Sequence, residues 1–405
     1  MEGAAATVME RCDILGRISE EPGRITRPYG SEAMRQVNDV VAGWMRASGM
    51  TVRQDAIGNL VGRYEGMGDK TLILGSHLDT VRDAGKYDGI LGMMVALTCL
   101  ERLHERGERL PFAIEVVGFA DEEGLRFGTT YLGSSVFAGA FNPKLLSLKD
   151  ANGVTLADAV RSFGGDPDGL VGNGRNAGEL IGYCEVHIEQ GPRLETHDLP
   201  IGIVSGIAGQ SRIVVGFEGK ADHAGTVPME GRRDALCAAA EFVVEVEATA
   251  RGEPGLVATV GEISVQPGAS NVIPGEVDLS LDIRHQDDEV REQACQALRQ
   301  RVEEIGAARE VVPRWHLRQE KRAVTFAPDL TALFEQAVGE LGYPVERLPS
   351  GAGHDAAQMA DLGPVAMLFV RCREGISHNP AESVRPEDVA VAIEVVNRFL
   401  ELVAK

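Results

Sequence analysis

The sequence predicts an α/β protein with two domains: a larger one around a mainly parallel sheet with helices on both faces, and a smaller α+β domain inserted into it. The chain has 405 residues, more than one ordinary core accommodates. Apolar, strand-like runs alternate with amphipathic helical segments over most of the chain, which is typical of β-α-β units. Between about residues 210 and 325 the order of elements changes, which indicates a second kind of sheet.

The larger domain is expected to comprise residues 1–209 and 326–405. Its first helix is predicted over 31–48, where apolar residues recur at helical spacing: Met34, Val37, Val40, Val41 and Trp44. The stretch 142–182, rich in Gly, Asp and Asn, is predicted as a short helix between surface loops. Apolar runs bounded by turn residues predict strands at 71–76, 112–120, 183–186 and 364–370, and helical periodicity predicts helices at 91–106, 328–341 and 386–403.

The inserted domain, residues 210–325, follows the order β-α-β-β-α-β, which is that of the ferredoxin-like fold. An alanine-rich helix is predicted at 234–250 and a second helix at 288–304. The second and third strands are joined by a Pro-Gly turn. The four strands are expected at 211–219, 256–265, 271–285 and 314–324.

The formal net charge of −21 argues against nucleic acid or an anionic membrane as a partner, because both require a cationic surface. This charge does not exclude a small anionic substrate, since one arginine in a pocket can bind a carboxylate whatever the net charge of the chain. The six cysteines form no Cys-x-x-Cys pair, which indicates reduced thiols of a cytoplasmic protein. There is no signal-peptide core and no apolar run of about 18 residues, so neither secretion nor a membrane span is expected.

Polar loops follow four strands of the larger domain, and these loops contain the candidate site residues. Open α/β sheets bind ligands beyond the carboxyl ends of their strands, so side chains in these loops are expected to converge. In chain order they are His77, Asp79, Asp88, Glu122, Glu123, His187 and His378.

Each of these residues has an ordinary structural explanation when it is taken alone. A histidine two residues before an aspartate can be a hydrogen-bonded pair, and the Tyr-Asp-Gly sequence around Asp88 is common in turns. Adjacent glutamates are usually a solvated charge run, while His187 can be a core histidine and His378 a surface one. Their joint placement after four strands is much harder to explain by chance, and it predicts a functional site.

The residue types indicate a metal site. Histidine, aspartate and glutamate together suit Zn²⁺ or Mn²⁺. A hydrolytic centre with two ions needs a bridging carboxylate, further ligands, and a base that accepts a proton from the attacking water. In the Glu122-Glu123 pair, one carboxylate can bind metal while the other acts as the base. Asp79 can orient the imidazole of His77.

The pattern His77-x-Asp79, Asp88, Glu122-Glu123, His187 and His378 resembles the dinuclear M20 metallopeptidase and amidohydrolase superfamily over essentially the whole chain. A histidine at position 187, where other members have an acidic residue, is similar to the branch that cleaves ureido groups. That branch contains the allantoate amidohydrolases and the N-carbamoyl-L-amino-acid hydrolases. Long runs resemble the plant-type allantoate amidohydrolases in particular: 81–89, 119–133, 206–212, 351–357 and 367–382.

The resemblance implies two divalent ions per subunit, Zn²⁺ or Mn²⁺, with manganese favoured by the plant-type runs. It also implies that Glu122 is the general base and that Asp88 bridges the ions. The implied ligands are His77, Asp88 and His187 for one ion, and Asp88, Glu123 and His378 for the other.

A small anionic ureido substrate is implied as well. His223 would reach the active site of the neighbouring subunit and stabilise the oxyanion there, so a homodimer is expected, with the inserted domain as lid and dimerisation unit. Taken alone, Arg284 is an ordinary strand arginine and His223 an ordinary loop histidine. The substrate-binding residues implied are Gln190, Gln210, His223, Asn271, Arg284 and Gly353.

The implied activity is hydrolysis of the terminal carbamoyl C–N bond of allantoate, which ends in ammonia and CO₂. The alternative is hydrolysis of N-carbamoyl-L-amino acids, followed by a peptidase or acylase activity of the wider superfamily. A non-catalytic binding or scaffold protein is disfavoured, because such a relative is expected to have lost a ligand or the base. The sequence has no Gly-x-Ser-x-Gly, His-Glu-x-x-His or Walker motif that would indicate another chemistry.

Overall fold

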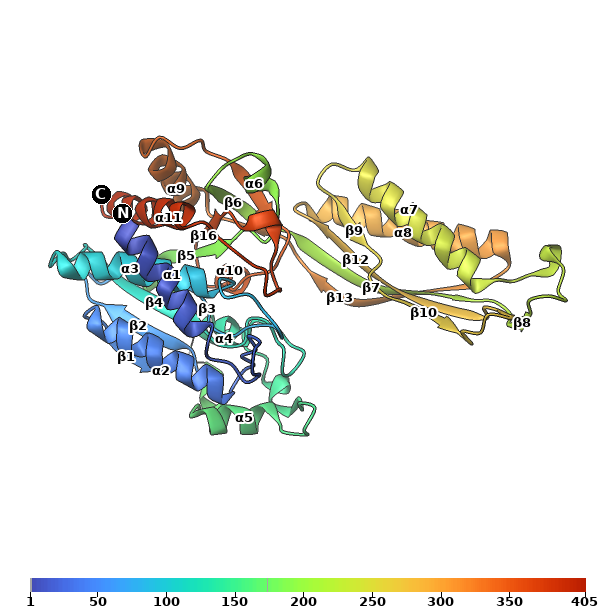
Figure 1. Cartoon of the computed structure of the whole chain (residues 1–405), viewed down its shortest axis with the longest axis horizontal. Coiled ribbons are helices and arrows are strands. Elements are labelled where there is room, and N and C mark those ends of the chain that lie inside the picture. Colours follow the sequence, from blue (N-terminus) through green and yellow to red (C-terminus); the bar gives the residue numbers. More distant parts are fainter. Residues whose placement is uncertain (1, 173) are drawn as a thin grey trace. The chain divides into compact units, whose positions relative to one another are not determined.

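The computed structural model describes residues 2–172 and 174–405, which form two compact units (Figure 1). Unit 1 consists of Met1–Ser205 and Phe326–Lys405, and unit 2 of Gly206–Thr325. Unit 2 is therefore inserted between two segments of unit 1. From the sequence we expect the boundaries at 209/210 and 325/326, so the first differs by four residues.

A nine-stranded sheet forms the core of unit 1. Its central strands lie in the order β4-β3-β5-β16 and pair parallel, while β1, β2, β6 and β14 pair antiparallel with their neighbours. The expected mainly parallel α/β sheet is thus confirmed for its centre. Eight of its strands are β1 (Thr51–Gln54), β2 (Leu60–Tyr64), β3 (Thr71–His77), β4 (Ala113–Phe119), β5 (Leu180–Ile188), β6 (Ile201–Ile207), β15 (Arg347–Ser350) and β16 (Val365–Val370). The ninth, β14 (Val324–Thr325), pairs with β6 and consists of the last two residues of the range given for unit 2.

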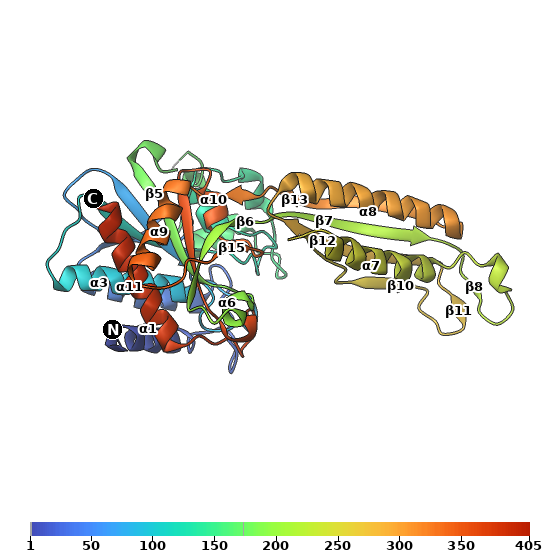
Figure 2. The same ribbon diagram turned by 90° about the horizontal axis from the view of Figure 1, so that it is seen from above.

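Helices cover both faces of this sheet, because successive side chains of a strand point to opposite sides. Cys184 and Val186 of β5 lie in the apolar core under α3, α9 and α11 (Figure 2). Glu185 points the other way and accepts a hydrogen bond from the first backbone N–H of α10. The helices of unit 1 are α1 (Glu2–Leu15), α2 (Glu32–Ala47), α3 (Ile90–Glu105), α4 (Leu132–Phe137), α5 (Leu156–Phe163), α6 (Arg193–Thr196), α9 (Pro328–Glu340), α10 (Ala356–Met359) and α11 (Pro386–Val403).

Local sequence explains where the long helices begin. Ser31 caps α2, its side chain accepting a hydrogen bond from the backbone N–H of Met34, and the apolar stripe of this helix is buried. Pro328 and Pro386 occupy first helical positions, where the missing N–H costs nothing. The helices predicted at 31–48, 91–106, 328–341 and 386–403 are confirmed within one or two residues. The helix α1 and the strand β6 were not predicted, and neither were short helices such as α4 and α10, whose sequences are too brief to show a period.

Unit 2 contains a five-stranded antiparallel sheet in the order β10-β12-β7-β13, with β9 beside β12. Two long helices, α7 (Ala235–Gly252) and α8 (Asp288–Arg309), pack on one face of it (Figure 1). Asp234 and Asp287 cap these helices with their carboxylates. The strands are β7 (Gly209–Glu218), β9 (Val257–Thr259), β10 (Ile263–Gln266), β12 (Glu276–His285) and β13 (Val312–Lys321).

Two strands predicted in unit 2 are each divided, which corrects the sequence-based assignment. The strand expected at 256–265 is interrupted around Gly261, where residues 260–262 oppose only two residues of β12, a β-bulge. The strand expected at 271–285 is interrupted at Pro274, which has no N–H for the ladder. The piece before Pro274, β11 (Val272–Ile273), pairs instead with β8 (Asp222–His223) in a separate small sheet.

All six cysteines are free thiols, and four of them are buried: Cys12, Cys99, Cys184 and Cys372. Burial raises the pKa of the Cys372 thiol to about 11, so this group stays protonated at neutral pH. None of the helices in the described ranges combines the length and apolar character that crossing a membrane requires.

Candidate metal centre

The candidate loops meet at one edge of the sheet of unit 1. β4, β3, β5 and β16 are neighbours and run parallel, so their carboxyl ends lie on the same side. His77 is the last residue of β3 and His187 the penultimate residue of β5. Glu122 and Glu123 follow β4, and His378 lies in the loop after β16. The convergence expected from the sequence is therefore observed.

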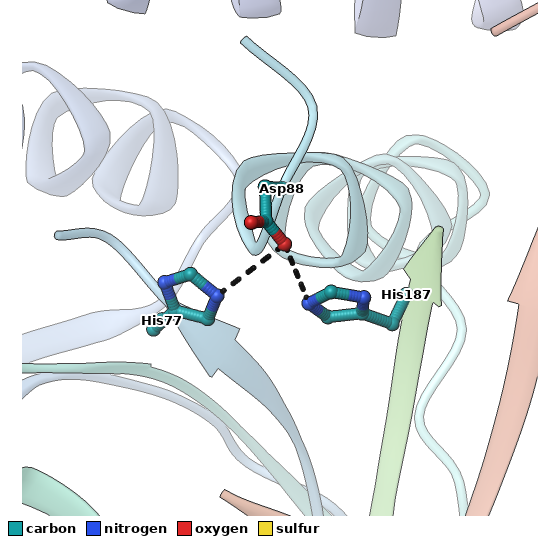
Figure 3. A group of neighbouring side chains, drawn as sticks. All are labelled: His77, Asp88 and His187. Carbon is teal, nitrogen blue, oxygen red and sulfur yellow. Dashed lines mark ion pairs between the residues drawn. The ribbon is translucent and has the colours of Figure 1, made fainter. Parts of the chain in front are cut away.

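Asp88 lies at the centre of the cluster, and its two carboxylate oxygens face different histidines. Oδ1 lies 3.1 Å from Nε2 of His187 and 3.9 Å from Nε2 of His77 (Figure 3). Oδ2 lies 3.1 Å from Nε2 of His378, and that nitrogen is also 3.1 Å from Oε1 of Glu123. Two groups of side chains thus share Asp88, one on each of its oxygens.

Each group has the composition and size of a metal site. His77, Asp88 and His187 form one group and Asp88, Glu123 and His378 the other, with the ligand atoms of each within 4.8 Å of one another. Imidazole nitrogens and carboxylate oxygens are common ligands of transition metals such as zinc. The side chains present therefore fit metal ions, and Asp88 has the position of a bridging carboxylate.

Backbone carbonyls orient two of the imidazoles. Nδ1 of His77 lies 3.0 Å from the carbonyl oxygen of Asp79, and Nδ1 of His187 lies 2.9 Å from that of Ile188. A carbonyl oxygen only accepts, so Nδ1 carries a hydrogen in both rings, and the neutral form of each ring has its lone pair on Nε2. Both Nε2 atoms face Asp88, which is the orientation that metal binding requires.

Asp79 has a different main contact from the one expected. Its Oδ1 lies 3.7 Å from Nδ1 of His77, which is too far for a hydrogen bond. That nitrogen is instead bonded to the backbone carbonyl of Asp79. The buried carboxylate instead accepts the backbone N–H of Glu122 at 3.0 Å and that of Glu123 at 3.1 Å. The side chain of Asp79 therefore holds the turn that carries the two glutamates.

Glu122 has the environment of a proton acceptor. Its side chain is buried, and burial together with the neighbouring charge of Glu123 raises its pKa well above the usual range. With His77 and Glu123 it forms a further group whose ligand atoms lie within 4.8 Å of one another. Glu122 belongs to neither of the groups that share Asp88.

The other charges around Asp88 are strongly coupled. Although burial favours its protonated form, contacts with His187 and His378 hold the pKa of Asp88 well below the usual range. Burial opposes a charged His187, but the Asp88 carboxylate raises its pKa to about 9. Hydrogen bonds with Asp88 and Glu123 raise the pKa of His378 to about 10. The carboxylates of Asp88 and Glu123 thus favour a positive charge, such as a protonated histidine or a bound cation, in each of the two groups that share Asp88.

Three side chains hold Asp88 from outside the two groups. Gln190 was expected to bind substrate, yet its amide donates to Oδ1 of Asp88 at 3.2 Å and to Oγ of Ser377 at 3.1 Å. Ser377 and Glu382 were not predicted, although both lie in the run 367–382 that carries the family resemblance. Their residue types alone give no signal, because serine and glutamate are common in surface loops.

Gly353 and His354 lie next to the metal-site histidine His187 in unit 1. A Cβ atom on Gly353 would collide with the hydroxyl group of Tyr131, so a side chain at this position would displace Tyr131. His354, which was not predicted, is buried with its ring centre 4.4 Å from that of His187. Burial lowers the pKa of His354 well below the usual range, so this ring is neutral.

The remaining candidate residues lie in unit 2, at opposite ends of its sheet. Gln210 and Arg284 are cross-strand partners, and both donate to the carboxylate of Asp282. His223 lies beyond the other end of β7, where Val272 is its partner in the small sheet and the carbonyl of Asn271 accepts the N–H of Ala224. Asn271 thus lies near His223, at the end of unit 2 opposite to Arg284.

Residues 73–402 match the family Peptidase family M20/M25/M40. The chain is 42% identical over 385 residues to an N-carbamoyl-L-amino acid amidohydrolase of Geobacillus stearothermophilus, covering 94% of each. It is 41% identical over 421 residues to a probable allantoate deiminase of Oryza sativa subsp. japonica, covering 95% of this chain and 85% of that one.

A crystal structure of an amidase of the hydantoinase/carbamoylase family from Burkholderia multivorans is similar in fold, with a TM-score of 0.91 and 33% identity over 98% of this chain and 97% of that one. The family match and the groups around Asp88 agree on a hydrolytic metal centre. This chain therefore belongs to the M20/M25/M40 peptidase family, as one of its metal-dependent amidohydrolases.

Proposed function

We propose that this protein hydrolyses the terminal carbamoyl C–N bond of allantoate at a centre of two divalent ions. The observation that carries the proposal is the position of Asp88. Its Oδ1 faces His77 and His187 while its Oδ2 faces His378, as a bridging carboxylate requires. Support for allantoate comes from the 41% identity to a probable allantoate deiminase over 95% of the chain.

The proposed ligands are His77, Asp88 and His187 for one ion, and Asp88, Glu123 and His378 for the other. Zn²⁺ and Mn²⁺ both suit this mixture of imidazole and carboxylate. When bound, such ions polarise the scissile carbonyl and lower the pKa of the attacking water. The raised pKa values of the free histidines fit a site that exchanges protons for metal ions.

Glu122 is the proposed general base. It accepts a proton from the water that attacks the terminal carbamoyl carbon, and it delivers a proton to the departing inner nitrogen as the C–N bond breaks. Carbamate leaves and decomposes to ammonia and CO₂, and the other product retains the amino group. The pKa of Glu122, raised mainly by burial, gives the carboxylate the proton affinity that this role needs.

Substrate binding is proposed for Gln210 and Arg284, because a guanidinium pairs with a carboxylate through two parallel hydrogen bonds. Asp282 fixes both side chains, with distances of 2.8 Å to Nε2 of Gln210 and 2.8 Å to Nε of Arg284. Gln190 and Gly353 are the proposed contacts from unit 1. Gln190 would then contact the substrate and also donate a hydrogen bond to Asp88.

His223 and Asn271 are proposed to act on the substrate of a partner subunit. β7 spans about 26 Å between Gln210 and Glu218 at the usual rise per residue, and His223 lies beyond that end (Figure 1). Because allantoate is much smaller, one molecule cannot contact both Gln210 and His223 of the same chain. This supports a homodimer in which unit 2, as a ferredoxin-like lid and dimerisation domain, completes the neighbouring site.

A cytoplasmic location is part of the proposal, supported by the six free cysteines. Hydrolysis of an N-carbamoyl-L-amino acid is the second candidate activity, favoured by the 42% identity to the Geobacillus stearothermophilus enzyme. Metal-loaded protein offered allantoate and a series of N-carbamoyl-L-amino acids would decide between them. We expect the larger kcat/KM for allantoate, and faster turnover of N-carbamoyl-L-methionine would assign the second activity instead.

A further inference from the structure

Glu382 joins two loops that are far apart in the sequence. Its Oε1 accepts the backbone N–H of Tyr87 at 2.7 Å and that of Asp88 at 3.0 Å. Its Oε2 lies 3.3 Å from Oγ of Ser377, which belongs to the same loop as His378. Only 4% of Glu382 is exposed, so these hydrogen bonds are shielded from water.

The hydrogen bonds continue to the carboxylate of Asp88. Oγ of Ser377 lies 3.3 Å from Oδ2 of Asp88 as well as from Oε2 of Glu382, and its single hydrogen is shared between these two acceptors. Nε2 of Gln190 lies 3.2 Å from Oδ1 of Asp88. Nε2 of Gln190 is also 3.1 Å from Oγ of Ser377. Glu382 therefore fixes the backbone of Asp88, while Ser377 and Gln190 fix the two oxygens that face the metal-site histidines.

Gly85 provides the space that Glu382 occupies. A Cβ atom at this position would collide with the Glu382 side chain, including its carboxylate. Gly85 is not among the glycines with positive φ, so alanine can adopt its backbone conformation. A Gly85→Ala substitution would therefore act by displacing Glu382.

The loop that carries His378 also contacts Asp88 through His378 itself, whose Nε2 lies 3.1 Å from Oδ2 of Asp88. Its internal hydrogen bonds include those from Glu382 N to the Asn379 carbonyl at 3.0 Å and from Arg373 N to the Ser383 carbonyl at 2.9 Å. These bonds shape the loop but do not position it against Asp88. The side chain of His378 is itself 48% exposed, so packing holds it only weakly.

We propose that Glu382 is a positioning residue that locks the His378 loop onto Asp88 and sets the Asp88 carboxylate between the two metal-binding groups. This inference rests on the proposed function, because it concerns the metal centre used there. Glu382 belongs to none of the metal-ligating groups found among the described residues. Its action is therefore through hydrogen bonds and not through ligation.

A role in hydrogen bonding has a specific consequence for Glu382→Gln. The glutamine oxygen can accept both backbone N–H groups, and its amide can donate to Ser377, whose hydroxyl then donates to Asp88. This variant should bind metal within a few-fold of the unchanged protein. Glu382→Ala and Gly85→Ala lose these contacts, and we expect metal affinity about 10- to 100-fold weaker, as for other residues that orient ligands.

The test is titration of metal-free protein with Mn²⁺ by calorimetry, with electron paramagnetic resonance to detect coupling between two Mn²⁺ ions. Glu387→Ala is the matched control, since this exposed glutamate lies five residues further on. Ser377→Ala is the milder variant, because it leaves the bonds from Glu382 to the backbone intact, and it should weaken the coupling signal. Circular dichroism of each metal-free variant establishes that it is folded.

The outcomes separate this inference from the proposed function. If the unchanged protein binds no metal, the proposed function itself fails. If the unchanged protein binds two ions and folded Glu382→Ala or Ser377→Ala binds them with the same affinity and coupling, the positioning role is wrong. Glu382→Gln as weak as Glu382→Ala would also overturn it, because the negative charge, and not hydrogen bonding, would then be what matters.

Discussion

Asp79 and Glu122 are joined by a hydrogen bond from the backbone N–H of Glu122 to Oδ1 of Asp79, at 3.0 Å. The second oxygen of Asp79 accepts the N–H of Glu123 at 3.1 Å in the same way. One buried carboxylate therefore fixes the turn from which the proposed base and a proposed ligand project. A side chain outside the proposed ligand set can in this way position both the proposed base and a proposed ligand.

Replacement of Asp79 by asparagine should disturb this turn. The amide offers one oxygen acceptor, and its NH₂ group would face a backbone N–H, so one of the two contacts is lost. We expect kcat/KM to fall about 10- to 100-fold, with weaker metal binding. Asp39→Asn, at an exposed position on α2, is the control and should behave as the unchanged protein. Full activity of Asp79→Asn would show that the turn does not need this carboxylate.

Glu122→Gln should separate metal binding from catalysis. Glutamine has nearly the same shape but cannot accept the proton, so kcat should fall about 10²- to 10⁴-fold while two ions remain bound. Glu123→Gln is the matched comparison, because it should lose metal as well as activity. Metal content by elemental analysis and steady-state kinetics on the same samples test both variants. Undiminished turnover by Glu122→Gln would remove this residue from the role of base.

Removal of the metal should abolish activity reversibly. Chelation is expected to leave a folded, inactive protein, and adding back Zn²⁺ or Mn²⁺ should restore turnover. Elemental analysis after growth without added metal, compared with the activity that each ion restores, identifies the ion used. Turnover that persists after complete removal of metal would overturn the mechanism.

Metal binding should release protons at neutral pH. The pKa values of about 9 for His187 and about 10 for His378 mean that both imidazoles are protonated in the metal-free protein at pH 7. Only the neutral imidazole binds metal. The apparent affinity for metal should therefore rise with pH until the pH exceeds the pKa values of both histidines. Calorimetric titrations in buffers of different ionisation enthalpy measure the protons released. Release of no protons at pH 7 would contradict the charged state of both rings.

The shared active site can be tested by complementation. His223→Ala and Glu122→Gln proteins should each be nearly inactive as homodimers. After subunit exchange, a mixed dimer combines both defects in one site and leaves the other intact, so about half the activity per mixed dimer should return. Exchange is followed with differently tagged chains. Demonstrated exchange without recovery would mean that His223 serves its own chain or has no catalytic role.

The sequence alone determined the four central strands of the sheet of unit 1 and the ligand candidates, since both are encoded locally. A buried parallel strand needs a continuous apolar run, and the polar residues after it must lie at the sheet edge, as His77 and Glu122 do. Because strands and helices alternate along the chain, these strands run parallel, and their carboxyl ends lie at the same edge of the sheet. Helix caps such as Ser31 are equally local.

Only the tertiary structure decided the contacts that orient these residues. Glu382 binds the backbone of Asp88 across 294 positions, and nothing in its own neighbourhood distinguishes it from a surface glutamate. The bulge at Gly261 and the separate pairing of Val272 with His223 depend on the partner strand, so a strand's own sequence does not reveal them. Periodicity reports which face of an element is buried, whereas hydrogen bonds between distant loops form only when the packed sheet brings the loops together.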